Sequence, residues 1–286
     1  MTAVFRASAP AEETGPLLGP LAELPGIWFG TGFNLISRPD FSQNKPFFLE
    51  LNETHESLTF TEIGAPIPNR GSGQPDIFFL GVHYLQQISD AVTKGALHLE
   101  PGIWLNVPAT TDPVADASVV RLATIPHGDS LLAQGTSTTV EGGPRIQPVS
   151  STPTQASGPT AGQPVTGAYL DPFTTTPLPP GVPVGSIANP NLVLTEAIKN
   201  QKIVETTVLV IDTTTPIGGL AGGIENMPFT VKNANATRMN AIFWIEKVQR
   251  EDGEGHFLQL QYTQTVILNF LGIDWPHIAV ATLVKH

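Results

Sequence analysis

The sequence has no cysteine among its 286 residues. Disulfide bonds, thiolate metal sites, thiolate-ligated haem and cysteine nucleophiles are therefore excluded. Basic residues are also scarce, because 14 lysines and arginines stand against 25 acidic residues and the formal net charge is −11. Contacts to phosphate need clustered lysine and arginine side chains, so this composition argues against a nucleic-acid-binding protein.

Long apolar runs are missing as well. No stretch reaches the roughly 18 apolar residues that a membrane span requires, and the first 20 residues lack the apolar segment of a signal peptide. We therefore expect a cytoplasmic protein without a membrane partner, beginning with a flexible tail over residues 1–20. Residues 21–286 are enough to bury a full core, and we expect them to form one domain.

Strand-like patterns dominate the rest of the chain, with frequent β-branched side chains. Because amphipathic helices do not separate most of these strands, we expect antiparallel pairing as a meander sheet, a sandwich or an up-and-down barrel. About ten such strands close most simply as an all-β antiparallel barrel with a ligand-sized interior. The predicted strands cover residues 26–33, 45–53, 56–64, 76–89, 96–107, 118–126, 130–139, 202–212, 240–250, 256–268 and 275–284.

The middle of the chain has a different composition. Residues 141–190 are rich in proline, glycine, serine and threonine, and hold too few large apolar side chains to form a core of their own. A short helix is predicted at 190–200. We expect a long insertion at about 140–235 that interrupts the barrel. If the strand at 202–212 lies outside the barrel, its edge could pair with another chain and form a homodimer.

His277 is the first candidate for chemistry. It shares strand parity with Ala279, Ala281 and Leu283, so its side chain points to a face of small and apolar residues. A histidine in that position is either a satisfied core residue or a metal ligand.

Two further histidines, His83 and His98, lie within apolar strands. His98 shares parity with Glu100, which places it either on the solvent face or in a partly polar cavity. The remaining histidines are expected to be solvated at turns or at the chain end: His55, His127, His256 and His286.

Other chemistries find little support in the sequence. No closely spaced set of ligands indicates zinc, no Gly-x-Ser-x-Gly elbow indicates a serine hydrolase, and no carboxylate pair stands out for glycoside hydrolysis. A single buried histidine at the end of a barrel suits one axial ligand to a planar cofactor.

Five segments, taken in order, resemble the nitrobindin family of haem-binding barrels. They are Gly-Ile-Trp-Phe-Gly-Thr-Gly at 26–32, Tyr-Leu-Gln at 84–86, Leu-His-Leu-Glu-Pro-Gly-Ile-Trp at 97–104, Leu-Leu-Ala-Gln-Gly at 131–135 and the closing strand at 277–285. The resemblance covers about 21–135 and 240–286, and typical members lack the residues between.

The resemblance implies haem b bound with His277 as the proximal iron ligand. It places His98 and Gln134 in the haem cavity, where they are the candidate catalytic residues, and it makes Trp28, Gly30 and Gly32 cofactor-binding. Leu97 and Ile267 are candidate cavity walls, with core packing as an equal alternative for both and for Trp28.

The function implied by this resemblance is the binding or conversion of nitric oxide, peroxide or peroxynitrite at ferric haem, as in a peroxidase or a peroxynitrite-isomerase-like enzyme. A non-catalytic carrier of haem or another small apolar ligand is the alternative.

Overall fold

The computed structural model describes residue 15 and residues 17–214 and 222–286. Most of the predicted tail, residues 1–14 and 16, and much of the glycine-rich stretch before residue 223 lie outside the described residues. Leu18, near the end of the predicted tail, is buried in the core. Nowhere in the described ranges is there a helix long and apolar enough to cross a membrane.

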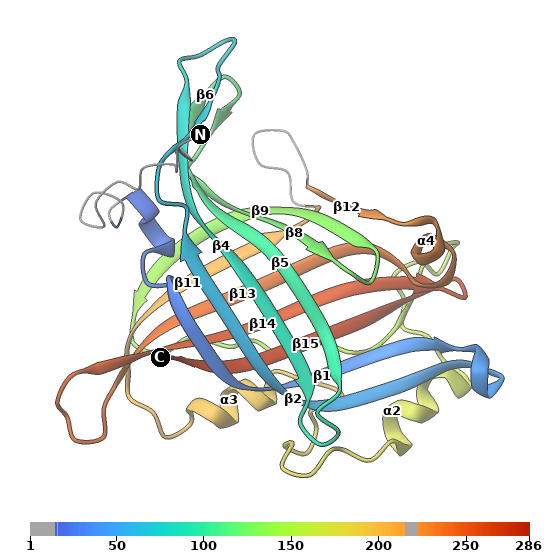
Figure 1. The fold of residues 1–286 in the computed structure, drawn as a ribbon. Helices are drawn as coiled ribbons and strands as arrows, with labels where there is room; N and C mark the ends of the chain where they lie inside the picture. Colours follow the sequence, from blue (N-terminus) through green and yellow to red (C-terminus); the bar gives the residue numbers. More distant parts are fainter. Residues whose placement is uncertain (1–14, 16, 215–221) are drawn as a thin grey trace, which may run out of the picture.

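Ten antiparallel strands close into a barrel (Figure 1). Each strand pairs with its neighbours in the order in which the barrel strands occur along the chain, and the first pairs with the last. This confirms the predicted fold class. The barrel strands are β1 (Gly26–Asp40), β2 (Lys45–Glu62), β4 (Ile77–Asp90), β5 (Ala96–Val107), β8 (Ser118–Ile125), β9 (Asp129–Glu141), β11 (Ile203–Asp212), β13 (Asn235–Gln249), β14 (His256–Phe270) and β15 (Ile273–Lys285).

Two glycines explain how the barrel closes between β1 and β15. A Cβ atom on Gly30 would lie 2.0 Å from the carbonyl oxygen of Thr282, and one on Gly32 would lie 2.3 Å from that of Val280. Any larger residue would therefore push the two strands apart. The glycine spacing in the first strand is thus accounted for by the close approach of the closing strand.

Strand β11 lies within the barrel, between β9 and β13. The region 140–235 therefore contributes one barrel strand, and within its described part Gly223–Asn226 also pairs with β9. Both edges of β11 are paired along much of its length, so the condition for an intermolecular edge at 202–212 is not met. The place of β11 between β9 and β13 could not be predicted from the sequence, because both partners are far from β11 along the chain.

The remaining elements are short. Strand β10 pairs with β15, β12 with β9, β3 with β4, and β6 with β7. Helices α2 and α3 lie outside the barrel wall (Figure 1). The short elements are η1 (Gly19–Leu21), η2 (Phe41–Gln43), η3 (Gly167–Leu170), α2 (Asp171–Thr175), α3 (Leu192–Ile198), α4 (Pro228–Ala234), β3 (Ile67–Asn69), β6 (Thr110–Thr111), β7 (Val114–Ala115), β10 (Thr154–Gln155) and β12 (Gly223–Asn226).

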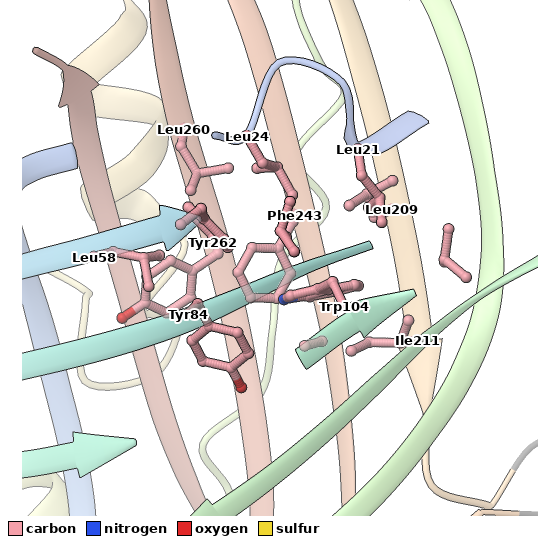
Figure 2. Packing of buried hydrophobic residues seen from close by; sticks show 14 of the residues in the cluster. Leu21, Leu24, Leu58, Tyr84, Trp104, Leu209, Ile211, Phe243, Leu260 and Tyr262 are labelled. Atoms are coloured by element: carbon pink, nitrogen blue, oxygen red, sulfur yellow. The ribbon is translucent and has the colours of Figure 1, made fainter. Parts of the chain in front are cut away.

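Large side chains fill the barrel interior near one end (Figure 2). Trp28 is fully buried there and donates its indole N–H to the carbonyl of Leu24 at 2.8 Å. Leu21, from η1, belongs to the same cluster. This end is therefore closed by side chains from η1 and the strands, with Trp104, Phe243 and Tyr262 packed in the same cluster.

A second apolar cluster lies where the segment between β9 and β11 crosses the outside of the wall. Leu194 of α3 and Val165 pack with Phe33, Val280 and Trp244 from the strands. The insertion thus gains its burial from the barrel, in agreement with a composition too polar to form a separate core.

Candidate functional site

The His277 imidazole ends a chain of side-chain hydrogen bonds that crosses four neighbouring strands. Its Nε2 lies 2.8 Å from Asn34 Oδ1. Asn34 Nδ2 donates to Asn52 Oδ1 at 3.4 Å, and Asn52 Nδ2 donates to Asp90 Oδ2 at 2.9 Å. An ionised carboxylate can only accept hydrogen bonds, so the amide nitrogen of Asn52 must face Asp90 and its oxygen must face Asn34. The amide nitrogen of Asn34 then faces Asn52, and its oxygen accepts a hydrogen bond from Nε2 of His277. The lone pair of the neutral ring is therefore on Nδ1.

Asp90 anchors this chain as a carboxylate. Its Oδ1 accepts hydrogen bonds from the backbone N–H groups of Val92 and Thr93 at 2.9 and 2.6 Å. The backbone bond from Thr93 and the amide of Asn52 lower the pKa of Asp90 to about 2. Asp90 is thus ionised at neutral pH, and the direction of every bond in the chain holds there.

His277 itself remains neutral. Burial, and to a smaller extent the charges of the nearby His98 and His127, lower the pKa of His277 to about 3. Its Nδ1 has no hydrogen-bond partner within the described part of the chain. A neutral imidazole with a free lone pair is the form that binds a metal or accepts a proton.

His98 contacts the buried ion pair between Glu100 and Arg121. Its Nε2 is 3.2 Å from Glu100 Oε2. The other oxygen of Glu100 accepts hydrogen bonds from Arg121 and Tyr84, and Arg121 also donates to Gln264 Oε1 at 2.6 Å. Burial would raise the pKa of Glu100, but the Arg121 guanidinium and His98 outweigh it and bring that pKa to about 2.

The ion pair settles the orientation of His98. Because Glu100 is a carboxylate, Nε2 of His98 is the donor, and in the neutral ring Nδ1 carries the lone pair. The ring stacks on His127, with ring centroids 5.6 Å apart. Of the two alternatives for His98, the structure therefore selects the partly polar interior, where Glu100 is fully buried.

A second buried carboxyl group, Glu56, lies in the same interior. Tyr262 donates to Glu56 Oε2 at 2.6 Å, Gln86 donates to the same oxygen at 3.4 Å, and Thr54 donates to Oε1 at 3.0 Å. Burial raises the pKa of Glu56 above its ordinary value, although these hydrogen bonds oppose the rise. The interior thus holds one carboxyl group with a lowered pKa and one with a raised pKa, an arrangement typical of acid–base sites.

A cavity of about 680 Å³ is lined by His98 and His127, and His277 is not among its lining residues. Its walls include His98, His127 and Glu56, together with Leu97 and Lys94 from the β4–β5 hairpin. The size is in the range of small-molecule sites. Across the described ranges, no group of three or more His, Asp or Glu side chains could hold a metal ion by itself.

The other predicted cofactor-binding residues lie elsewhere. Trp28 lies near the closed end, six residues from Asn34 along β1, or about 20 Å. Gly30 and Gly32 face the backbone of β15. His277 lies near enough to His98 to be affected by its charge, whereas Trp28 lies in the apolar core, with Lys285 Nζ 5.5 Å from its ring centre.

Gln134 and the two predicted wall residues are also placed. Leu131 and Ala133 face the interior, so Gln134, with the opposite parity on β9, points outward. Leu97 lines the 680 Å³ cavity. Ile267 is buried on β14 but belongs to neither apolar cluster.

Of the five remaining histidines, three are simply exposed and two pack against another ring. His83 and His55 are exposed on strands, and His256 is exposed at the start of β14. His127, predicted to be a solvated turn residue, is exposed but also stacks on His98 and lines the cavity. His286 packs edge-on against Phe29.

Sequence reasoning missed the residues that orient the histidines. Asn34, Asn52 and Arg121 are polar residues at inward positions of otherwise apolar strands, and this parity was the available signal. Their pairing could not be read from the sequence, because it depends on the register between strands.

No family model and no curated protein matches this chain. Among solved structures, the chain is similar to one described as the crystal structure of Rv2717c from M. tuberculosis, with 16% sequence identity and a TM-score of 0.45. The match covers 98% of this chain and 99% of that chain. At this level of similarity it carries no inference about function.

Proposed function

We propose that this barrel binds haem b at the end that holds His277, His98 and His127, here called the histidine end, with Nδ1 of His277 as the iron ligand. We further propose that it binds or converts a small oxidant or nitric oxide there. The observation that carries the proposal is the neutral His277, whose tautomer is fixed by the hydrogen-bond chain from Asp90. Metal-binding histidines usually have their other ring nitrogen bonded in this way.

Two further observations support haem over a bare metal ion. The described residues provide no cluster of three protein ligands, whereas haem brings four ring nitrogens of its own and needs one from the protein. A cavity of about 680 Å³ also lies beside His98 and His127, partly walled by apolar side chains, and His277 is close enough to both for their charges to affect it. The residues present therefore fit this group.

Bound haem would supply a redox-active iron that binds nitric oxide or reacts with peroxide or peroxynitrite. His98 would supply the proton acceptor, because Glu100 holds its Nε2 and leaves Nδ1 with the lone pair. Arg121 acts through Glu100, keeping that carboxylate ionised and in place. A base held in this way is what proton transfer to or from a small oxidant requires.

The test is a titration of the purified protein with haemin, followed by the Soret band. Wild type is expected to bind one haemin with a shifted Soret band, and His277→Ala to bind it at least tenfold more weakly. His83→Ala is the matched control, because His83 is exposed on the outside of β4. Equal affinity of wild type and His277→Ala would overturn the proposal.

A second measurement separates an enzyme from a carrier. If the complex is an enzyme, it will turn over hydrogen peroxide or peroxynitrite faster than free haemin, and His98→Ala will lose about 10²–10⁴-fold of that gain. A complex that binds haemin through His277 but reacts no faster than free haemin is a carrier.

A further inference from the structure

The segment that leaves the wall after β9 forms a second cavity on the outside of the barrel. This cavity has a volume of about 480 Å³. One wall is chain from the insertion, including Arg145 and Val149, and another is the outer face of β11 and β13, including Val208, Val210 and Trp244. It shares no lining residue with the histidine cavity.

Hydrogen bonds hold the walls of this outer cavity together. Thr263 on β14 donates to Asn191 Oδ1 at 2.5 Å, and Asn191 Nδ2 donates to the carbonyl of Gln147 at 2.7 Å. The backbone N–H of Val149 donates to Asn189 Oδ1 at 3.0 Å. Asn191 and Thr263 are both buried. The insertion is thus tied to the strand face that it covers, and the cavity is formed without a ligand.

Trp244 is buried at 3% exposure on the cavity floor. Trp28 and Trp275 both donate their indole N–H to backbone carbonyls. The indole N–H of Trp244 has no such partner among the residues that the structure describes. Trp104 likewise makes no such bond within the described part of the chain, and Trp244 Nε1 is not one of the fully buried polar atoms without a partner, so this N–H is accessible to a molecule in the cavity.

Arg145 supplies a positive charge to the same lining. Arg38, Arg70 and Arg121 each pair with a carboxylate, whereas Arg145 is exposed and makes no ion pair with any described residue. One acidic residue, Glu141, also lines the cavity. The remaining lining is largely apolar and includes Val208, Val210 and Ile242.

We infer that the outer cavity binds a small molecule with an apolar or aromatic body and one carboxylate, its body against Trp244 and its carboxylate on Arg145. Apolar walls with a few polar groups and one charge are typical of such sites, and arginine is well suited to carboxylates. The site gives the insertion a binding role and does not depend on the proposed haem site.

The test uses isothermal titration calorimetry of the full chain with 4-phenylbutyrate and with the neutral 4-phenylbutanol. Wild type is expected to bind both saturably, the carboxylate more tightly. Arg145→Ala should weaken 4-phenylbutyrate about tenfold, the effect of losing one charge-assisted hydrogen bond, and leave 4-phenylbutanol within about twofold.

Val210→Trp is the variant that blocks the cavity. Val210 lines the cavity and is 44% exposed, so a larger side chain there need not disturb folding. It should abolish binding of both compounds, whereas Val184→Trp, at an exposed valine outside the cavity lining, should not. No saturable binding to wild type, an unchanged affinity in Arg145→Ala, or full binding in Val210→Trp would each overturn the inference.

Discussion

Two buried carboxyl groups, one inside the barrel and one on its covered outer face, differ in their partners and therefore in their pKa. Glu100 and Glu246 are each fully buried. Arg121 and His98 bring the pKa of Glu100 to about 2 against the effect of burial. Among the described residues, Glu246 accepts a side-chain hydrogen bond from the amide of Gln259 at 2.6 Å and pairs with no cation, and burial raises its pKa to about 7.

The same contrast extends to the surrounding polar atoms. At the histidine end, both oxygens of Glu100 and of Glu56 have partners. Under the insertion, Glu246 Oε1, Gln261 Oε1 and Thr265 Oγ1 lack hydrogen-bond partners among the described residues. The hydrogen bonds around Glu100 and Glu56 hold these side chains in one geometry, which chemistry requires, although Asp129 Oδ1 near His127 lacks a partner among the described residues. The outer face buries several polar groups that the covering chain satisfies only in part.

The largest expected effect comes from breaking the ion pair inside the barrel. Arg121→Met leaves Glu100 buried without its cation and should lower the free energy of unfolding by about 3–5 kcal/mol at pH 7, measured by urea denaturation. The double variant with Glu100→Met should recover most of that loss. A loss under 1 kcal/mol would show that Arg121 does not stabilise Glu100.

Removing one leucine from each apolar cluster compares the two regions directly. Leu260 lies in the interior cluster and Leu194 in the outer one, and both are fully buried. Leu260→Ala and Leu194→Ala should each lower the free energy of unfolding by about 2–5 kcal/mol. If Leu194→Ala leaves the denaturation curve unchanged, the insertion does not unfold together with the barrel.

Glu246→Gln should change how stability depends on pH. Below about pH 4.5 the carboxyl is protonated in both the folded and unfolded states. Between pH 4.5 and about 7 only the unfolded state releases the proton, so Glu246 makes the folded state progressively less stable as pH rises. The variant should therefore exceed wild type by up to about 3 kcal/mol at pH 8 and by little at pH 4.5.

The difference in stability between Glu246→Gln and wild type at each pH reports on Glu246 alone, because the contribution of His277 is the same in both proteins. The contribution of His277 has the opposite pH dependence, since it is a buried neutral histidine. The pKa of His277 is lowered to about 3, so its contribution falls as pH decreases below 6.5. A difference between Glu246→Gln and wild type that is the same at pH 4.5 and pH 8 would contradict the raised pKa.

A smaller effect should follow from loosening the orientation of His277. Asn34→Ala removes the acceptor on Nε2 and should weaken haemin binding about 10- to 100-fold, as loss of a partner to a metal-binding histidine usually does. Asn269→Ala is the matched control, because this asparagine pairs with Asp274 outside the chain that ends at His277. Equal losses in both variants would mean that Asn34 acts through stability alone.

Much of the fold followed from local patterns. Alternation predicted the strands, and parity placed His277 on a face of small and apolar residues, whereas it left His98 open between the solvent face and a partly polar cavity. The predicted strands at 45–53 and 56–64 are one strand, β2, because the polar residues between them alternate inward and outward. These residues read as a turn, although Asn52 and Glu56 supply part of the interior network.

The relations between distant strands could not be predicted. The chain from His277 to Asp90 depends on the register of four strands that are separate in the sequence. The position of Gln134 followed the resemblance, but a one-residue difference in parity decides which face a strand residue occupies. The cavity under the insertion depends on how residues 143–149 cross the wall, which no local pattern records.

The most direct test of His277 as the iron ligand is a crystal structure of the protein with haemin. We expect the iron to be bonded to Nδ1 of His277, with Nε2 still hydrogen-bonded to Asn34 and the outer cavity free of haemin. Iron bonded to His98 or His127 instead, or haemin in the cavity beneath the insertion, would contradict the assignment of the histidine end as the site and of His277 as its ligand.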